Sequence, residues 1–183
     1  MNLPNILTLS RIVLIPVIVL IYYLPYTWSY PAAAAIFALA SATDWLDGYL
    51  ARKWNQTTPM GAFLDPVADK LIVAVALTML VEEHHDPLLT VPAMVIIGRE
   101  IVISALREWM AEMGKRASVA VSYIGKIKTT CQMVSIILLL MTRPDTTIAA
   151  IGTLLLYAAA ILTLWSMVVY LIAAWPDLRS HKK

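Results

Sequence analysis

Six long apolar stretches, separated by short polar segments, run along the 183-residue chain. An α-helix of about 20 residues spans the roughly 30 Å hydrocarbon core of a bilayer, and each stretch is about that long or longer. Backbone groups in lipid find hydrogen-bond partners only in helices or closed barrels, so we expect helices. The expected spans are Ile6–Leu24, Pro31–Ala51, Ala62–Val81, Val91–Met113, Tyr123–Thr142 and Ile148–Ala174. The pattern predicts an all-α integral membrane protein with six transmembrane helices, interpreted as one domain over residues 1–183.

The composition favours the same class of protein. Hydrophobic residues make up 60% of the chain and charged residues 14%, and the mean hydropathy is +0.75. Soluble domains are about 45–50% apolar and about 25% charged, so a soluble globular enzyme is excluded. The apolar content also excludes a disordered chain, and the single cysteine, Cys131, excludes a disulfide scaffold. We expect the lipid bilayer, and no nucleic acid, as the macromolecular partner.

The basic residues are divided unequally between the two sides of the predicted bundle. With six spans both termini lie on one side, and cytoplasmic loops of membrane proteins carry an excess of Lys and Arg. The basic residues on the side of the termini are Arg52, Lys53, Lys115, Arg116, Lys126, Lys128, Arg179, Lys182 and Lys183, whereas the opposite loops hold only Arg143. We therefore predict that both termini are cytoplasmic.

A cleavable secretory signal is an alternative interpretation of the first span. Arg11 precedes an apolar stretch, and Pro31 is followed by four alanines that a signal peptidase could accept. Removal of this segment would leave five spans and would place the basic loops on the wrong side of the membrane. We therefore interpret the segment as a retained first helix.

Four carboxylates lie within or at the ends of two apolar spans: Asp44, Asp47, Asp65 and Asp69. A carboxylate in hydrocarbon costs at least about 2.5 kcal/mol unless it is paired, hydrated or bound to metal. The first two are three residues apart and the last two are four apart, so each pair presents both carboxylates on one helix face. If the helices run antiparallel around the short cytoplasmic loop Lys53–Met60, the two pairs meet near the cytoplasmic boundary.

Four converging carboxylates cannot all stay ionised without cations. Oxygen ligands favour Mg²⁺, Mn²⁺ or Ca²⁺, and two divalent ions would balance the four charges and leave positions for phosphate oxygens. Structural ion pairs with Arg52, Lys53 and Lys70 are an alternative, as is a path for protons or cations in a transporter. The aspartates therefore predict a metal site while these alternatives stay open.

The full pattern is Asp44-x-x-Asp47-Gly48-x-x-Ala51-Arg52, eight residues, then Gly61-x-x-x-Asp65-x-x-x-Asp69. It resembles the signature of the CDP-alcohol phosphotransferase family, and every fixed position of that signature is occupied. The resemblance implies a six-helix membrane enzyme with a CDP-linked lipid or alcohol as donor. It also implies two divalent cations, Mg²⁺ or alternatively Mn²⁺, held by the four aspartates, with Asp69 acting in addition as general base.

The resemblance assigns contacts with the CDP group to residues around the aspartates. These are Asp47, Gly48, Ala51, Arg52 and Gly61. A glycine lets a nucleotide approach the backbone closely, although helix packing is an alternative reason for both glycines. Arg52 has the forked donors that suit phosphates, although a boundary arginine also extends to the membrane surface without a ligand.

A second set of charged residues suggests the acceptor. Arg99 and Arg107 lie eight residues apart on one span, which places them close to one helix face. Together with Arg11, Lys126 and Lys128 they predict a pocket for the phosphate of an acceptor alcohol. Glu100, Glu108 and Glu112 lie on the same span and are alternative partners for the arginines. An acceptor that carries a phosphate needs such a pocket, whereas serine, choline or free inositol does not.

The wider sequence is similar to the bacterial branch of the family that uses glycerol 3-phosphate. The similarity rests on residues 2–11, on Gly98-Arg99-Glu100 with Ser104-Ala105-Leu106-Arg107-Glu108, and on Gly125-Lys126-Ile127-Lys128-Thr129. It implies transfer of the phosphatidyl group from CDP-diacylglycerol to sn-glycerol 3-phosphate, giving phosphatidylglycerol phosphate and CMP. It further implies a homodimer in the bacterial inner membrane, with the active site facing the cytoplasm. Inositol phosphate, phosphatidylglycerol and serine stay open as acceptors.

Two other features have simpler interpretations. His84 and His85 are adjacent and therefore point in different directions, which favours solvated polar residues over a metal site. Cys131 lies in the middle of a span, where cysteine usually contributes to packing.

Overall fold

The computed structural model describes residues 3–54, 59–112 and 123–180, and this part of the chain forms six α-helices. The helices are α1 (Leu3–Tyr22), α2 (Ser29–Trp54), α3 (Pro59–His84), α4 (Pro87–Glu112), α5 (Tyr123–Met141) and α6 (Thr147–Ser180). Each of the six apolar spans coincides with one helix, so the all-α prediction is confirmed. The helices α2 and α3 extend further than the pattern predicted, because α2 ends at Trp54 and α3 begins at Pro59, both within the expected loop Lys53–Met60.

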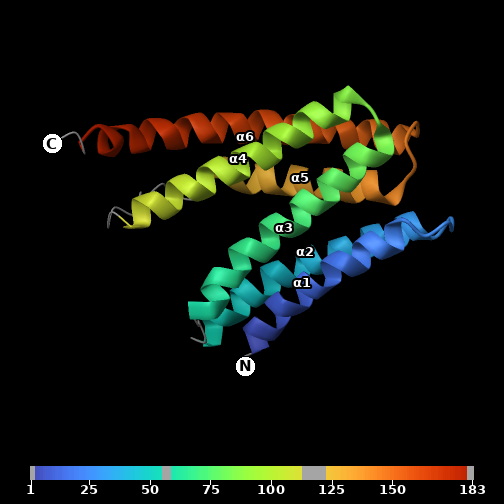
Figure 1. The fold of residues 1–183 in the computed structure, drawn as a ribbon, viewed down its shortest axis with the longest axis horizontal. Coiled ribbons are helices and arrows are strands. Elements are labelled where there is room, and N and C mark those ends of the chain that lie inside the picture. The colour runs from blue at the N-terminus through green and yellow to red at the C-terminus, as the bar shows by residue number, and fades with distance from the viewer. Residues whose placement is uncertain (1–2, 55–58, 113–122, 181–183) are drawn as a thin grey trace.

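Consecutive helices run in opposite directions (Figure 1). The turns α1–α2, α3–α4 and α5–α6 lie at one end of the molecule, and both chain termini lie towards the other end. Within the bundle, α1 packs against α2 and α3, α5 packs against α2 and α6, and α4 packs against α6 and α3. This arrangement agrees with an even number of spans, while the orientation in a membrane stays a prediction.

Side chains in the turns fix where two helices begin. The Leu88 amide donates to Asp86 Oδ1 at 2.9 Å, and Pro87 occupies the first helical position of α4. Asp86 is therefore the N-cap, and proline is suited to the next position because its missing amide is not needed there. At α6 the Ala149 amide donates to the Thr146 hydroxyl at 3.0 Å, which is a second N-cap. These caps set the ends of the helices on the side away from the aspartates.

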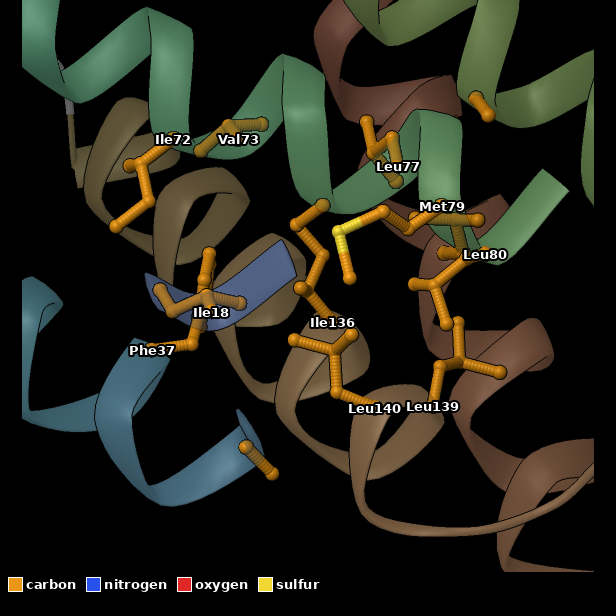
Figure 2. Close-up of a cluster of buried hydrophobic side chains, with 14 of the residues drawn as sticks. Ile18, Phe37, Ile72, Val73, Leu77, Met79, Leu80, Ile136, Leu139 and Leu140 are labelled. Atoms are coloured by element: carbon orange, nitrogen blue, oxygen red, sulfur yellow. The ribbon is translucent and has the colours of Figure 1, made fainter. Parts of the chain in front are cut away.

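The centre of the bundle is an apolar core to which all six helices contribute. Figure 2 labels residues of this core that come from α1, α2, α3 and α5. Phe37, Leu77, Ile136 and Leu139 are completely buried in it. The adjoining contact between α5 and α6 requires a glycine, because a Cβ atom at Gly152 would lie 2.8 Å from Leu139 Cγ. The absence of a side chain at Gly152 therefore leaves room for the Leu139 side chain, and small residues at helix contacts are typical of membrane proteins.

The distribution of polar residues is that of a membrane protein. Polar side chains such as Thr8, Gln132 and Ser135 are buried, while Leu20 and Leu154 are among the large apolar residues on the surface. Among the described residues, Pro87–Glu112 and Thr147–Ile172 are long and apolar enough to cross a bilayer, and shorter apolar helices cover Thr8–Tyr22 and Ser29–Thr43.

Candidate active site

The aspartates of α3 lie one turn apart near the beginning of that helix. Asp65 and Asp69 are both partly exposed, and Gly61, one turn before them, is buried. The continuous helix around them confirms the four-residue spacing that places both carboxylates on one face. The carboxylates of α3 are therefore partly accessible, whereas the backbone turn at Gly61 is covered.

Two residues of α1 hold Asp65. The Thr8 hydroxyl donates a short hydrogen bond to Asp65 Oδ1, and Arg11 Nη2 lies 3.6 Å from the same oxygen. Arg11 is only 1% exposed, whereas the Asp65 side chain is 44% exposed. The cation at Asp65 is thus Arg11, which the sequence analysis had placed in the acceptor pocket. Arg11 and Thr8 fix the orientation of this carboxylate.

The remaining residues of the aspartate signature lie on α2. The backbone of α2 continues through Asp44, Asp47, Gly48, Ala51 and Arg52, but the side chains of these residues lie outside the described part of the structure. Asp44 and Asp47 belong to the last three turns of α2, and Asp65 and Asp69 belong to the first three turns of α3. Since residues 55–58 alone connect the two helices, both pairs lie towards the same end of the molecule.

The residues present fit a hard divalent cation. Asp65 and Asp69 offer only oxygen donors, from one helix face that is partly exposed. Within the described side chains no group of three His, Cys, Asp or Glu residues forms a complete metal site. The sequence analysis also expects Asp44 and Asp47 in this metal site, and their side chains lie outside the described part of the structure.

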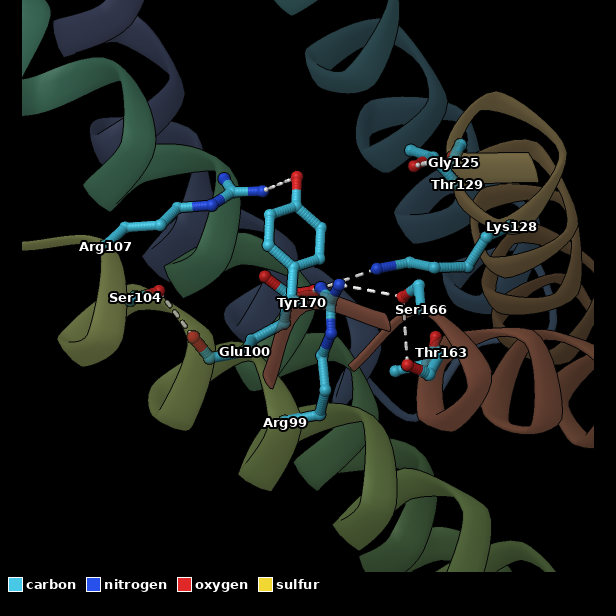
Figure 3. Close-up of polar contacts among 10 residues, drawn as sticks. All are labelled: Arg99, Glu100, Ser104, Arg107, Gly125, Lys128, Thr129, Thr163, Ser166 and Tyr170. Atoms are coloured by element: carbon cyan, nitrogen blue, oxygen red, sulfur yellow. Dashed lines mark hydrogen bonds and ion pairs between the residues drawn. The ribbon is translucent and has the colours of Figure 1, made fainter. Parts of the chain in front are cut away.

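A basic cluster joins α4 to α5 (Figure 3). Arg99 Nη1 lies 2.6 Å from Glu100 Oε1, and Lys128 Nζ lies 3.1 Å from the same oxygen. Arg99 and Lys128 are each 7% exposed. The structure therefore brings together two of the five residues that the sequence assigned to the acceptor phosphate, and it adds a carboxylate between them.

Helix α6 contributes two further residues that the sequence analysis missed. Arg99 Nη2 donates to Ser166 Oγ at 2.9 Å, and Arg107 Nη2 donates to the Tyr170 hydroxyl at 2.8 Å. The Arg107 guanidinium also lies 5.0 Å from the centre of the Tyr170 ring, a cation–π contact. Thr163, Ser166 and Tyr170 form a polar stripe at helical spacing within a mainly apolar part of α6, and this stripe is the signal that could have revealed Ser166 and Tyr170.

Lys126 differs from the other basic residues. It lies on α5 two residues before Lys128, and its side chain is exposed. Since residues two apart on a helix point in different directions, Lys126 faces away from the contact that Lys128 makes with Glu100. In the described part of the chain, the cluster is formed by Arg99, Glu100, Lys128 and Ser166. Arg107 contacts Tyr170, which lies one helical turn beyond Ser166 on α6.

A cavity of about 390 Å³ lies between α3 and α4. Val73 and Ala74 of α3 and Ile97 of α4 contribute to its mainly apolar wall, and Lys70 and Glu100 also line it. Lys70 directly follows Asp69, and Glu100 belongs to the basic cluster. The cavity therefore lies between the helix of the aspartates and the helix of the basic residues.

The two simpler features are found outside this region. His84 Nδ1 lies 2.9 Å from the Leu80 carbonyl and His84 is partly buried, whereas His85 is exposed, so the two rings do not share a site. The prediction that both histidines are solvated was therefore correct only for His85. Cys131 is partly buried and packs against the core, as predicted.

Comparison with known proteins agrees with this arrangement. The CDP-alcohol phosphatidyltransferase family matches residues 1–172. The CDP-diacylglycerol–glycerol-3-phosphate 3-phosphatidyltransferase of Escherichia coli (strain K12) is 59% identical over 177 residues, which cover 97% of both chains. The proteins of the same name from Shigella flexneri serotype 5b and Shigella boydii serotype 4 match with the same identity and coverage. The six-helix fold, the complete aspartate signature and these matches show that the chain belongs to the CDP-alcohol phosphatidyltransferase family.

Proposed function

We propose that this protein transfers the phosphatidyl group of CDP-diacylglycerol to sn-glycerol 3-phosphate, giving phosphatidylglycerol phosphate and CMP. The observation that carries this proposal is the 59% identity, over 97% of both chains, to relatives named for this reaction. The reaction is the first committed step towards phosphatidylglycerol and cardiolipin. The whole chain, residues 1–183, acts as one domain.

The family generally uses divalent metal ions, and the aspartates are the residues suited to hold them. Asp44, Asp47, Asp65 and Asp69 would bind two cations, with Mg²⁺ favoured and Mn²⁺ as the alternative. Such ions neutralise the negative charge of the pyrophosphate group when they are bound. Arg11 and Thr8 support this role because they hold Asp65 in one orientation.

Asp69 acts as general base. The reaction forms a bond between an acceptor hydroxyl oxygen and the phosphorus joined to diacylglycerol, and it breaks the bond between that phosphorus and the CMP oxygen. The attacking hydroxyl must lose its proton, and the partly exposed carboxylate of Asp69 can accept it. CMP takes the negative charge of the leaving group.

The CDP group is bound beside the aspartates by Asp47, Gly48, Ala51, Arg52 and Gly61. Four of these five residues lie on the last turns of α2, and buried Gly61 lies on the first turn of α3. Both helices reach the same end of the molecule, so these residues and the aspartates can serve one nucleotide.

The acceptor phosphate is bound by the basic cluster. Arg99, Arg107 and Lys128 carry three positive charges, and Glu100 carries one negative charge, so the cluster keeps an excess of two. A phosphate ester near pH 7 is largely a dianion and matches this excess. Arg11 and Lys126 complete the set of residues proposed to bind the acceptor phosphate. Arg11 would do so from its position next to Asp65.

The protein is placed in the bacterial inner membrane with both termini and the active site facing the cytoplasm, and it forms a homodimer. The unequal distribution of basic residues supports this orientation. Labelling of single cysteines introduced at Arg143 and at Lys183, each in a protein in which Cys131 is replaced by serine, would test it in intact cells. Only the cysteine at position 143 should react with an impermeant reagent, and the reverse pattern would contradict the orientation.

Release of CMP from CDP-diacylglycerol by the detergent-purified protein tests the function. Glycerol 3-phosphate, serine, inositol and inositol phosphate are supplied in separate reactions with Mg²⁺. We expect release only with glycerol 3-phosphate and loss of release with a chelator. CMP release with another acceptor would support the assignment of the donor and contradict the assignment of glycerol 3-phosphate as acceptor. No release with any alcohol would contradict the proposed function.

A further inference from the structure

Glu100 occupies a special position in the basic cluster. A single oxygen, Oε1, contacts both Arg99 Nη1 at 2.6 Å and Lys128 Nζ at 3.1 Å (Figure 3). The two cations come from different helices, α4 and α5, and Arg99 also reaches Ser166 on α6. The carboxylate of Glu100 is therefore the group through which the two buried cations are held together.

The charges explain why such a group is needed. Two like charges at close range repel each other, and neither cation is stable in an apolar bundle without an anion. A carboxylate between them removes the repulsion and fixes both side chains in one geometry. Ser166 cannot replace Glu100, because a neutral hydroxyl does not balance a charge.

The cluster still has unused polar groups. The Nε atom of Arg99 is buried and makes no hydrogen bond within the described part of the chain, and the same holds for Thr163 Oγ1. Ser166 joins the two residues, because its hydroxyl accepts a bond from Arg99 and donates to the Thr163 carbonyl at 3.0 Å. Buried polar groups without partners are uncommon in proteins, and these point to a polar ligand at the cluster.

We propose that Glu100 is a positioning residue for the acceptor phosphate. It holds Arg99 and Lys128 at the spacing in which both can contact one phosphate group, without itself contacting the reacting atoms. This inference rests on the proposed function, because it assigns the phosphate at the cluster to glycerol 3-phosphate. By charge alone, Glu100 would compete with the phosphate for Arg99. The proposal instead gives Glu100 a supporting role in phosphate binding.

The test uses the substitutions Glu100→Gln and Glu100→Asp in the full-length protein. Gln keeps the shape and removes the charge, so Arg99 and Lys128 are no longer held together. We expect the KM for glycerol 3-phosphate to rise about tenfold or more, because one charge-assisted contact with the phosphate is lost. The KM for CDP-diacylglycerol should stay within about twofold. Asp keeps the charge and should recover part of the loss. Glu112→Gln is the control, because Glu112 is an exposed acid on the same helix.

A merely structural role for Glu100 predicts a different result. Loss of packing would lower kcat or alter both KM values together, and either pattern would overturn the proposal, as would an unchanged KM for glycerol 3-phosphate. If Glu100→Gln does not fold, Glu100→Asp decides by the same comparison of the two KM values.

A second measurement separates this proposal from the proposed function. Inorganic phosphate should raise the melting temperature of the wild-type protein, and Glu100→Gln or Glu100→Asp should reduce this increase while Glu112→Gln keeps it. If the wild type releases no CMP with glycerol 3-phosphate but shows this phosphate effect, the proposed function fails and the role of Glu100 in anion binding stands. An equal phosphate effect in the Glu100 variants, or none in the wild type, overturns that role.

Discussion

The substitution Arg99→Lys tests the geometry of the basic cluster without removing its charge. Arg99 uses one nitrogen for Glu100 at 2.6 Å and another for Ser166 at 2.9 Å. A lysine ammonium is a single point and cannot reproduce a planar fork that serves two partners and a ligand. The variant should therefore fold, because the charge that balances Glu100 remains.

The expected magnitude follows from the contacts that are lost. A hydrogen bond that involves a charged group contributes about 1.5–3 kcal/mol, and every 1.4 kcal/mol corresponds to about tenfold in affinity. Loss of one such contact to the acceptor phosphate should therefore raise the KM for glycerol 3-phosphate about 10- to 100-fold. The KM for CDP-diacylglycerol should stay within about twofold, because the aspartate signature lies on α2 and α3.

Steady-state CMP release over a range of glycerol 3-phosphate concentrations measures this effect. Arg143→Lys is the matched control, because Arg143 is an exposed arginine in the α5–α6 turn at the opposite end of the molecule. An Arg99→Lys enzyme whose KM for glycerol 3-phosphate equals that of the wild type would refute the assignment of this cluster to the acceptor phosphate.

Three further predictions concern the base, the metals and the packing. Asp69→Asn should lower kcat by at least about 100-fold, because the attacking hydroxyl loses its base, with little change in the binding of CDP-diacylglycerol; near-normal turnover would exclude the assigned base. Treatment with EDTA should abolish CMP release and added Mg²⁺ should restore it; activity that survives exhaustive chelation would exclude the metal role. Gly152→Ala should lower the melting temperature by an amount that corresponds to about 1–3 kcal/mol, because the new Cβ would crowd Leu139; an unchanged melting temperature would show that α5 and α6 can separate at no cost.

The number and position of the helices could be predicted from the sequence because each span is a long apolar run. The predicted bounds of α2 and α3 were less accurate on either side of the expected loop Lys53–Met60. Arg52 lies just beyond the predicted span Pro31–Ala51, and Lys53 and Pro59 lie in the predicted loop, yet all three belong to helices. A polar residue at a helix end can continue the backbone hydrogen bonds of the helix, so the end of an apolar run does not predict the end of the helix.

The candidate site was predictable where the residues lie close together in the sequence. Asp65 and Asp69 share one helix, so their spacing fixed their common face. The contact of Arg11 with Asp65 and the contact of Lys128 with Glu100 join different helices, and sequence spacing contains no information on them. Glu100 therefore appeared only as an alternative partner of the arginines, and its bridging position required the structure.

Analysis of the lipid product by mass spectrometry tests the central claim most directly. The purified protein is incubated with CDP-diacylglycerol, Mg²⁺ and glycerol 3-phosphate in which the glycerol carbons are carbon-13. The proposed reaction predicts phosphatidylglycerol phosphate that carries all the labelled carbons, formed in equal amount to the released CMP. A lipid product without label, or CMP release without a labelled lipid, would contradict it.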